Sequence, residues 1–153
     1  MKPFGDRVEL SPAFGLGHLT LGSLECVQGN RAEALKQSQI AEQLLRDGSN
    51  PVLLAELANI YARLEHHKDA ERIFRRLQEM SETHRIPTTA WILAYLALGD
   101  DENTLHWLNE AADSPEPYVG YFGLLNIKAN AFASPVLDEP RFREVRERLG
   151  YRD

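Results

Sequence analysis

Few residues in this 153-residue chain have the types and spacing that chemistry requires. The glycine-rich stretch 15–22 lacks the spacing of a phosphate-binding loop, and no strand precedes it. His66 and His67 are adjacent, so on a helix their side chains would point about 100° apart. Only His67 and Glu71 have the four-residue spacing that places two metal ligands on one helix face, and no further ligand pair joins them. We therefore expect neither a phosphate loop nor a metal site.

The single cysteine is a nucleophile without a base. Cys26 and His18 lie eight residues apart on one expected helix, too far for a nucleophile–base pair, and such a cysteine is more often a small buried apolar residue. A lone cysteine excludes an intramolecular disulfide and favours a reducing, cytoplasmic compartment. No set of residues combines a nucleophile, a base and an oxyanion donor. We therefore predict a protein that is not an enzyme, with no catalytic residue and no cofactor.

Composition and charge are those of a folded, soluble protein of one domain. Hydrophobic residues make up 43% of the chain and charged residues 26%, which excludes global disorder. The formal charge of −6 argues against nucleic acid as a partner, because phosphate backbones attract basic surfaces. No stretch reaches the roughly 20 apolar residues of a membrane span, so we expect no membrane partner. The N-terminus also lacks the apolar core of a secretory signal.

Apolar periodicity indicates helices throughout. Breaker residues divide the chain into segments of about 12 to 18 residues, the length of helices rather than of strands. In the segment 70–80 the apolar residues recur at intervals of three and four and build one stripe, formed by Ala70, Ile73, Phe74, Leu77 and Met80. No segment alternates with a period of two over the length of a strand. An all-α fold is therefore predicted.

Residues typical of helix ends stand at the segment boundaries. A proline just inside a helix loses no hydrogen bond, and a polar side chain before it accepts one from a free backbone N–H. A glycine just past a helix suits the left-handed conformation that ends it. On these grounds the sequence predicts N-caps at Asn50-Pro51 and Ser11-Pro12, a capping box from Asn30 to Glu33, and left-handed ends at Gly29 and Gly99.

One pattern recurs at intervals of 36 and 34 residues. Leu21-Gly22, Leu57-Ala58 and Trp91-Ile92 align, and the rest of each segment follows without gaps. Small residues in the first helix of a segment would face small residues in the second and let the two helices approach closely. The further aligned sets are Glu25, Tyr61 and Tyr95; Gly29, Glu65 and Gly99; Ala34, Ala70 and Thr104; Ser38, Phe74 and Leu108; and Ala41, Leu77 and Ala111.

These positions resemble the tetratricopeptide repeat family, whose unit is a helix-turn-helix of about 34 residues. The resemblance covers residues 12–116, three units that follow an N-terminal extension at 1–11. It implies an α-α superhelix of antiparallel helical hairpins. The chain departs from the family pattern at Glu65, where the turn glycine is expected, and at Glu25, where an aromatic residue is expected.

Residues 117–153 leave the repeat pattern. Within the run 138–150, Phe142, Val145 and Leu149 have helical spacing. This run resembles the ending found after degenerate tetratricopeptide arrays in bacterial signalling proteins. We expect a C-terminal helical segment that caps the last unit.

The resemblance also implies a concave groove, lined by the first helix of each unit, that binds a peptide. The family members that clamp a terminal carboxylate use Lys and Asn at several groove positions, and here only Asn59 fits, so we predict no such capture. The expected partner is a protein or peptide: an amphipathic helix, or the chain's own C-terminal segment 118–125 or 142–149. The groove positions in this sequence are Leu19, Ser23 and Cys26; Ala55, Asn59, Ala62 and Arg63; and Thr89, Leu93 and Leu96.

The function implied is a non-enzymatic module for protein–protein interaction, either a small adaptor or the regulatory part of a larger signalling protein. One alternative is a helical domain that binds a small ligand or catalyses a reaction in the groove through Asn59, Arg63, His18 or Tyr95. A second alternative is self-association through exposed apolar edges, which would give a homo-oligomer.

Overall fold

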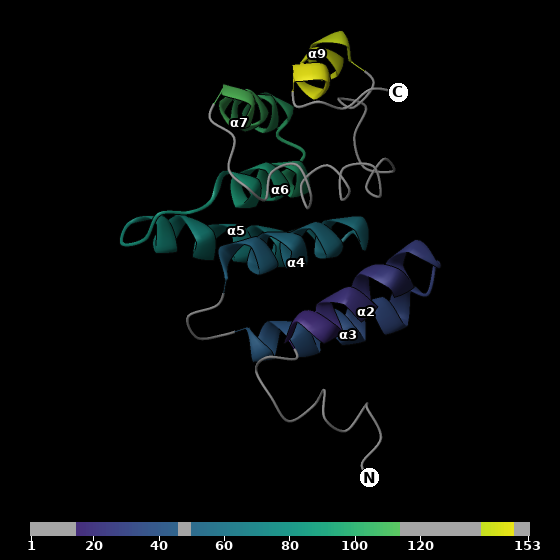
Figure 1. Cartoon of the computed structure of the whole chain (residues 1–153). Coiled ribbons are helices and arrows are strands. Elements are labelled where there is room, and N and C mark those ends of the chain that lie inside the picture. Colours follow the sequence, from purple (N-terminus) through teal and green to yellow (C-terminus); the bar gives the residue numbers. More distant parts are fainter. Residues whose placement is uncertain (1–14, 46–49, 114–138, 149–153) are drawn as a thin grey trace.

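The computed structural model describes residues 15–45, 50–113 and 139–148, and every regular element in these ranges is an α-helix (Figure 1). The prediction of an all-α chain is confirmed for this part. Residues 1–11, the Ser11-Pro12 cap, the segment 118–125 and Leu149 of the predicted C-terminal helix lie outside it. The helices are α2 (Gly15–Val27), α3 (Arg31–Leu44), α4 (Pro51–Arg63), α5 (His67–Ser81), α6 (Thr88–Leu98), α7 (Asp101–Asp113) and α9 (Pro140–Arg148).

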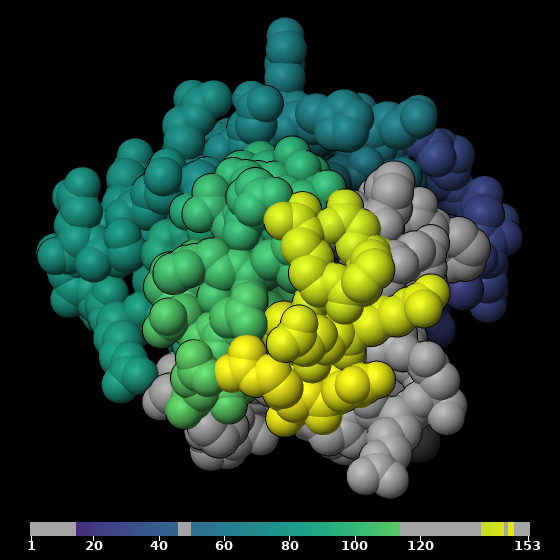
Figure 2. All heavy atoms as spheres, turned by 90° about the horizontal axis from the view of Figure 1, so that it is seen from above, coloured from purple at the N-terminus to yellow at the C-terminus, as the bar shows by residue number. Residues whose placement is uncertain are grey.

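Consecutive helices pack in pairs, and the pairs lie in successive layers (Figure 1). Helix α2 packs on α3, α4 on α5, and α6 on α7. The first helices of the pairs also pack on one another, because α4 contacts both α2 and α6. Helix α9 packs on α7 at the end of the molecule away from α2 (Figure 2). No helix in the described ranges is both long and apolar enough to cross a membrane.

A left-handed residue ends the first helix of each pair. Gly29, Glu65 and Gly99 have φ values of 83°, 63° and 70°. Glycine adopts this conformation without steric cost, so the two glycines behave as predicted. Glu65 is the one residue other than glycine with a positive φ in the described ranges. Its Cβ incurs the steric cost that glycine avoids, because the chain turns at the same place as in the other two pairs.

The hydrogen bonds at these three turns are the same. In each, the amide of the left-handed residue donates to the carbonyl three residues back, and the next amide donates to the carbonyl five residues back. Together these two bonds satisfy helix-terminal carbonyls in a Schellman motif. The first bonds are Gly29 to Cys26, Glu65 to Ala62 and Gly99 to Leu96, and the second are Asn30 to Glu25, His66 to Tyr61 and Asp100 to Tyr95, at 2.8–3.2 Å.

One predicted N-cap is confirmed and one predicted capping box is wrong. Asn50 Oδ1 accepts a hydrogen bond of 2.9 Å from the amide of Val52, with Pro51 in the first turn. Asn30 makes no cap hydrogen bond through its side chain. Its Nδ2 donates instead to Glu25 Oε2 at 2.6 Å, and Glu33 accepts from Gln37. The Asn30 side chain is therefore hydrogen-bonded to the Glu25 carboxylate on the preceding helix and does not cap α3.

Two hydrophobic clusters form the interior, and α6 belongs to both. The larger cluster draws on helices α2 to α6 and contains Ala90, Leu93, Ala94 and Ala97 from one side of α6. The smaller cluster joins α6, α7 and α9, through Ile92 and Leu96, through Leu105, Leu108 and Ala111, and through Phe142 and Val145. The two clusters place α6 between the α4–α5 pair and the α7–α9 end.

Candidate functional site

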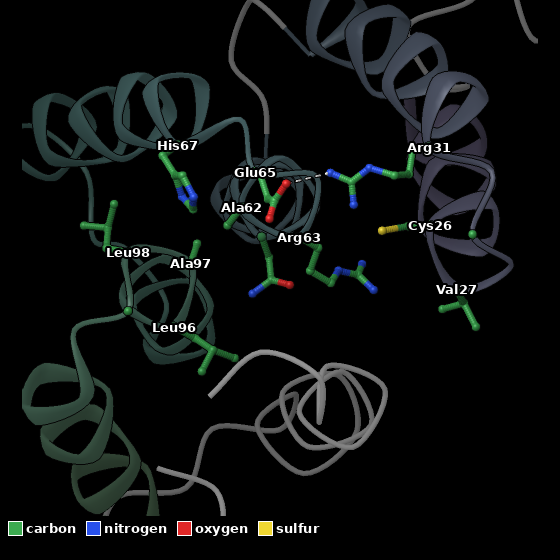
Figure 3. Close-up of a pocket in the computed structure, with 13 residues that line it drawn as sticks. Cys26, Val27, Arg31, Ala62, Arg63, Glu65, His67, Leu96, Ala97 and Leu98 are labelled. Atoms are coloured by element: carbon green, nitrogen blue, oxygen red, sulfur yellow. Dashed lines mark hydrogen bonds and ion pairs between the residues drawn. The ribbon is translucent and has the colours of Figure 1, made fainter. Parts of the chain in front are cut away.

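A pocket of about 520 Å³ lies where the carboxyl ends of α2, α4 and α6 come together (Figure 3). Because the three turns have the same geometry and the first helices pack side by side, the turns open on the same side of the molecule. All three left-handed residues line the pocket. Its full lining is Cys26, Val27, Gly29, Arg31, Asn59, Ala62, Arg63, Glu65, His67, Leu96, Ala97, Leu98 and Gly99.

Arg63 brings a positive charge into this pocket. Its side chain reaches from α4 toward α2, on the side of Cys26 (Figure 3). Nη2 donates a hydrogen bond of 3.2 Å to Ser23 Oγ, a neutral acceptor, and Nε has no partner among the described residues. Burial lowers the pKa of the guanidinium, and electrostatic interactions with Cys26 and Glu56 act in the opposite direction. The guanidinium stays protonated, so the pocket holds a cation that is incompletely hydrogen-bonded.

Asn59 places an unpaired acceptor beside that cation. It lies one helical turn before Arg63, so the two side chains share a face of α4. Asn59 is only 2% exposed, and within the described part of the chain its Oδ1 has no hydrogen-bond partner. A buried polar atom without a partner costs about 1–3 kcal/mol. The site therefore contains one buried donor and one buried acceptor, four residues apart, that have no partner among the described residues.

The rim of the pocket is charged and the wall on α6 is apolar. Arg31 Nη2 donates to the carbonyl of Leu64 at 2.8 Å and lies 3.4 Å from Glu65 Oε2, which ties the start of α3 to the turn after α4 (Figure 3). Both side chains of this ion pair are more than half exposed, so the pair itself adds little stability. Leu96, Ala97 and Leu98 close the opposite side.

Five of the ten residues predicted to line a groove are brought together here: Cys26, Asn59, Ala62, Arg63 and Leu96. Ser23 adjoins them through its hydrogen bond to Arg63. The other four lie elsewhere. Leu19, Ala55 and Leu93 belong to the larger hydrophobic cluster, and Thr89 is buried with its Oγ1 unpaired among the described residues.

Arg31 and His67 also line the pocket. The sequence prediction missed them because it considered only the first helix of each unit. The signal that could have found this region is the alignment of Gly29, Glu65 and Gly99, since three equivalent turns on packed helices must face the same way. Of the four groups considered for ligand binding or catalysis, only Asn59 and Arg63 line the pocket.

The other two candidate groups are engaged elsewhere. His18 Nδ1 is 2.6 Å from Gln37 Oε1. Tyr95 packs its ring on Phe74 and Trp91, and burial, with a smaller contribution from Asp100, raises the pKa of its hydroxyl. In the described ranges no three His, Cys, Asp or Glu side chains are grouped so that they could hold a metal ion.

Comparison with known proteins returns no match: no family model fits the chain, no curated protein is similar to it, and no solved structure matches its fold.

Proposed function

We propose that the chain is a tetratricopeptide-type interaction module that binds an extended segment of a partner protein in the pocket at Arg63 and Asn59, without catalysing a reaction. It acts as an adaptor or as the regulatory part of a larger signalling protein, in the cytoplasm, where its single cysteine remains reduced. The observation that carries the proposal is the unpaired donor beside the unpaired acceptor, on one face of α4 in the described part of the chain.

The repeated turns support the repeat architecture. The left-handed residue and its two hydrogen bonds recur at the 36- and 34-residue spacing read from the sequence. The first helices α2, α4 and α6 pack in succession, and each packs on its own second helix. In this arrangement α9 acts as the cap of the last unit, since it covers α7 with Phe142 and Val145. Stacked hairpins of this kind present an extended binding surface.

The polar atoms of the pocket fit a peptide group. In an extended segment, the carbonyl and the N–H of one residue point to the same side of the chain. Both atoms are buried, so the two side chains must turn toward the pocket on binding. The carbonyl would then accept from Arg63 Nε, and the N–H would donate to Asn59 Oδ1. Binding would pair both buried atoms, neither of which has a partner among the described residues. The apolar wall of α6 would hold an adjacent side chain of the partner.

The helix 140–148 is not the occupant of this pocket. Its buried residues Phe142 and Val145 belong to the smaller cluster with α7, and none of its residues lines the pocket. This observation favours a segment from another protein over this part of the chain's own C-terminal region.

The test uses peptides selected on the intact protein from a random-sequence display library. We expect peptides that bind the wild type and lose about 10- to 100-fold in affinity with Arg63→Gln, as for hydrogen bonds to a charged group. Arg75→Gln is the matched control, because Arg75 lies on α5 with its side chain 71% exposed and outside the pocket. Equal affinity for wild type and Arg63→Gln, measured by calorimetry, would contradict the proposal, as would a library that yields no binder.

The size of the pocket favours the binding of a small molecule as a second candidate function. A volume of about 520 Å³ is within the range of sites for small ligands. A thermal-shift screen of small molecules separates the two functions, since a true small-molecule site should yield ligands that raise Tm in the wild type and not in Arg63→Gln.

A further inference from the structure

The outward face of α2 is apolar and exposed. Leu16, Leu21, Leu24 and Val27 are 41–56% exposed, although each is a large hydrophobic residue. They lie across the helix from Gly15, His18, Leu19 and Gly22, which are buried. No Asp, Glu, Lys or Arg occurs between Gly15 and Leu24. An exposed apolar surface without charges is typical of an interaction site rather than of a solvated helix.

The equivalent positions in the other two first helices are interior. At the repeat spacing, Leu24 corresponds to Ile60 in α4 and Ala94 in α6, and both of these are fully buried. Leu21 corresponds to Leu57, also fully buried, and to Trp91.

Trp91 contacts aromatic rings in two pairs of helices. Its ring centroid lies 6.2 Å from that of Phe74 on α5, in the preceding pair, and 5.9 Å from that of Trp107 on α7. Ala94 and Ala97 belong to the same cluster as α4 and α5, whereas Ile92 and Leu96 face α7 and α9. The exposed face of α2 is therefore the one that α6 uses to pack on the pair before it.

The far end of the stack is occupied. Helix α9 lies beside α7 there, with Phe142 and Val145 buried in the smaller cluster (Figure 2). Neither helix exposes a large hydrophobic side chain among the described residues. A second molecule that placed its α2 face on α7 and α9 would therefore meet no exposed apolar side chain in the described part of this end. Four of the five exposed large hydrophobic side chains in the described ranges lie on α2, so the apolar surface that this part of the chain offers to the face is the same face on another copy. A contact between identical faces closes as a two-fold dimer.

We propose that two copies of this chain associate through the apolar face of α2 around a two-fold axis. Since no Asp, Glu, Lys or Arg occurs between Gly15 and Leu24, two copies can meet along this stretch without burying a like-charged pair. Leu24 does not line the pocket, so this association and the binding of a partner peptide are tested separately.

The test is the molar mass of the intact protein by sedimentation equilibrium over a wide range of concentration. We expect a monomer–dimer equilibrium for the wild type. Leu24→Lys should raise the dissociation constant of the dimer at least tenfold. Thr20→Lys should do the same from an exposed position on the same face, so the outcome does not depend on one variant folding. Gln78→Lys, at an exposed position of α5 outside the pocket, is the control and should leave the equilibrium unchanged.

Three results would overturn the proposal. The first is a wild type that stays monomeric at every concentration. The second is a dimer that withstands both Leu24→Lys and Thr20→Lys. The third is a monomer whose Tm falls with Leu24→Lys, because the face would then be covered by residues of the same molecule.

Discussion

Gly22 of α2 and Ser38 of α3 approach so closely that a side chain at residue 22 would have to displace Ser38. A Cβ built on Gly22 would lie 3.0 Å from Ser38 Oγ and 3.5 Å from the carbonyl oxygen of Ala34. Ser38 Oγ is itself fixed, since it donates a hydrogen bond of 2.8 Å to that carbonyl. This contact is the close approach that the small residues at positions 22 and 34 predict, and it sets the distance between the two helices.

Replacing Gly22 with leucine should therefore separate α2 from α3. We expect Gly22→Leu to lower the free energy of unfolding by roughly 1–3 kcal/mol, the usual cost of overpacking a filled interface. Lys36→Leu, at an exposed position of α3, is the control and should have little effect. Urea denaturation measures both. An unchanged stability in Gly22→Leu would mean that α2 does not pack on α3 at this residue.

Glu65→Gly should stabilise the protein. The left-handed conformation costs a residue with a Cβ about 1–2 kcal/mol, and glycine removes that cost. Little is lost in exchange, because the ion pair of Glu65 with Arg31 is exposed. Gly29→Ala and Gly99→Ala should shift the denaturation midpoint the opposite way, since both glycines have a positive φ although a Cβ at either would meet no atom within 4 Å. If Glu65→Gly lowers the midpoint as these two do, the conformation assigned to Glu65 is wrong.

Asp69 should make stability depend on pH in the acid range. Burial alone would raise its pKa, but hydrogen bonds from Arg72 and from His66, the latter at 3.1 Å, outweigh burial and lower the pKa below its ordinary value of 3.8. The folded state thus favours the carboxylate. Its contribution is complete above the ordinary value and is lost as the pH falls through the lowered one. We expect Asp69→Asn to reduce Tm near neutral pH and to differ less from the wild type near about pH 3.

Arg72→Met provides the control for this titration. In a protein that already carries Arg72→Met, the loss of Tm caused by Asp69→Asn should depend less on pH, because the strongest hydrogen-bond donor to the carboxylate is gone. Tm values of the wild type, the two single variants and the double variant, measured across the acid range, test this expectation. The same pH dependence with and without Arg72 would contradict it.

Asn59→Leu should separate stability from binding. The substitution removes a buried acceptor that has no partner in the described part of the chain, so we expect the free energy of unfolding to rise by about 1 kcal/mol. Binding of a selected peptide should weaken at the same time, as the acceptor for its N–H is lost. Calorimetry and urea denaturation of the same sample measure both effects. A variant that is more stable and binds equally well would leave the pocket without its proposed role.

Phe142→Ala should weaken the α7–α9 end. Phe142 is 1% exposed in the smaller cluster, and loss of a buried phenylalanine costs about 3–5 kcal/mol. Arg143→Ala, at the exposed neighbouring position, should change little. Unfolding in denaturant compares the two, and equal stabilities would show that α9 does not depend on this side chain.

The sequence predicted those helix ends at which the residue type favours the backbone conformation that it adopts. Gly29 and Gly99 were predictable because glycine favours the left-handed region, and Asn50 because proline follows it. Glu65 has no such signal of its own, and only its alignment with the two glycines identifies the turn. The capping box at Asn30 failed because Glu25, on the preceding helix, competes for the same side chain.

The pocket was predictable only in part, because its polar contacts join distant segments. The small and apolar positions at Cys26, Ala62 and Leu96 follow from the repeat alignment. The bond from Arg63 to Ser23 crosses 40 residues and depends on how α2 packs beside α4. No property of the sequence near Asn59 indicates that its oxygen lacks a partner among the described residues, since that depends on every helix around it.

Helix α6 has hydrophobic clusters on two sides, and this has a consequence for how the protein opens. If the α7–α9 end separates, Ala90, Leu93 and Ala94 still hold α6 to the α4 side; if α2 and α3 separate, Ile92 and Leu96 still hold it to α7. No single local opening exposes the whole helix to water. Its hydrogen-bonded backbone amides should therefore exchange with deuterium mainly through global unfolding, whereas those of α2 and α9 exchange through smaller fluctuations.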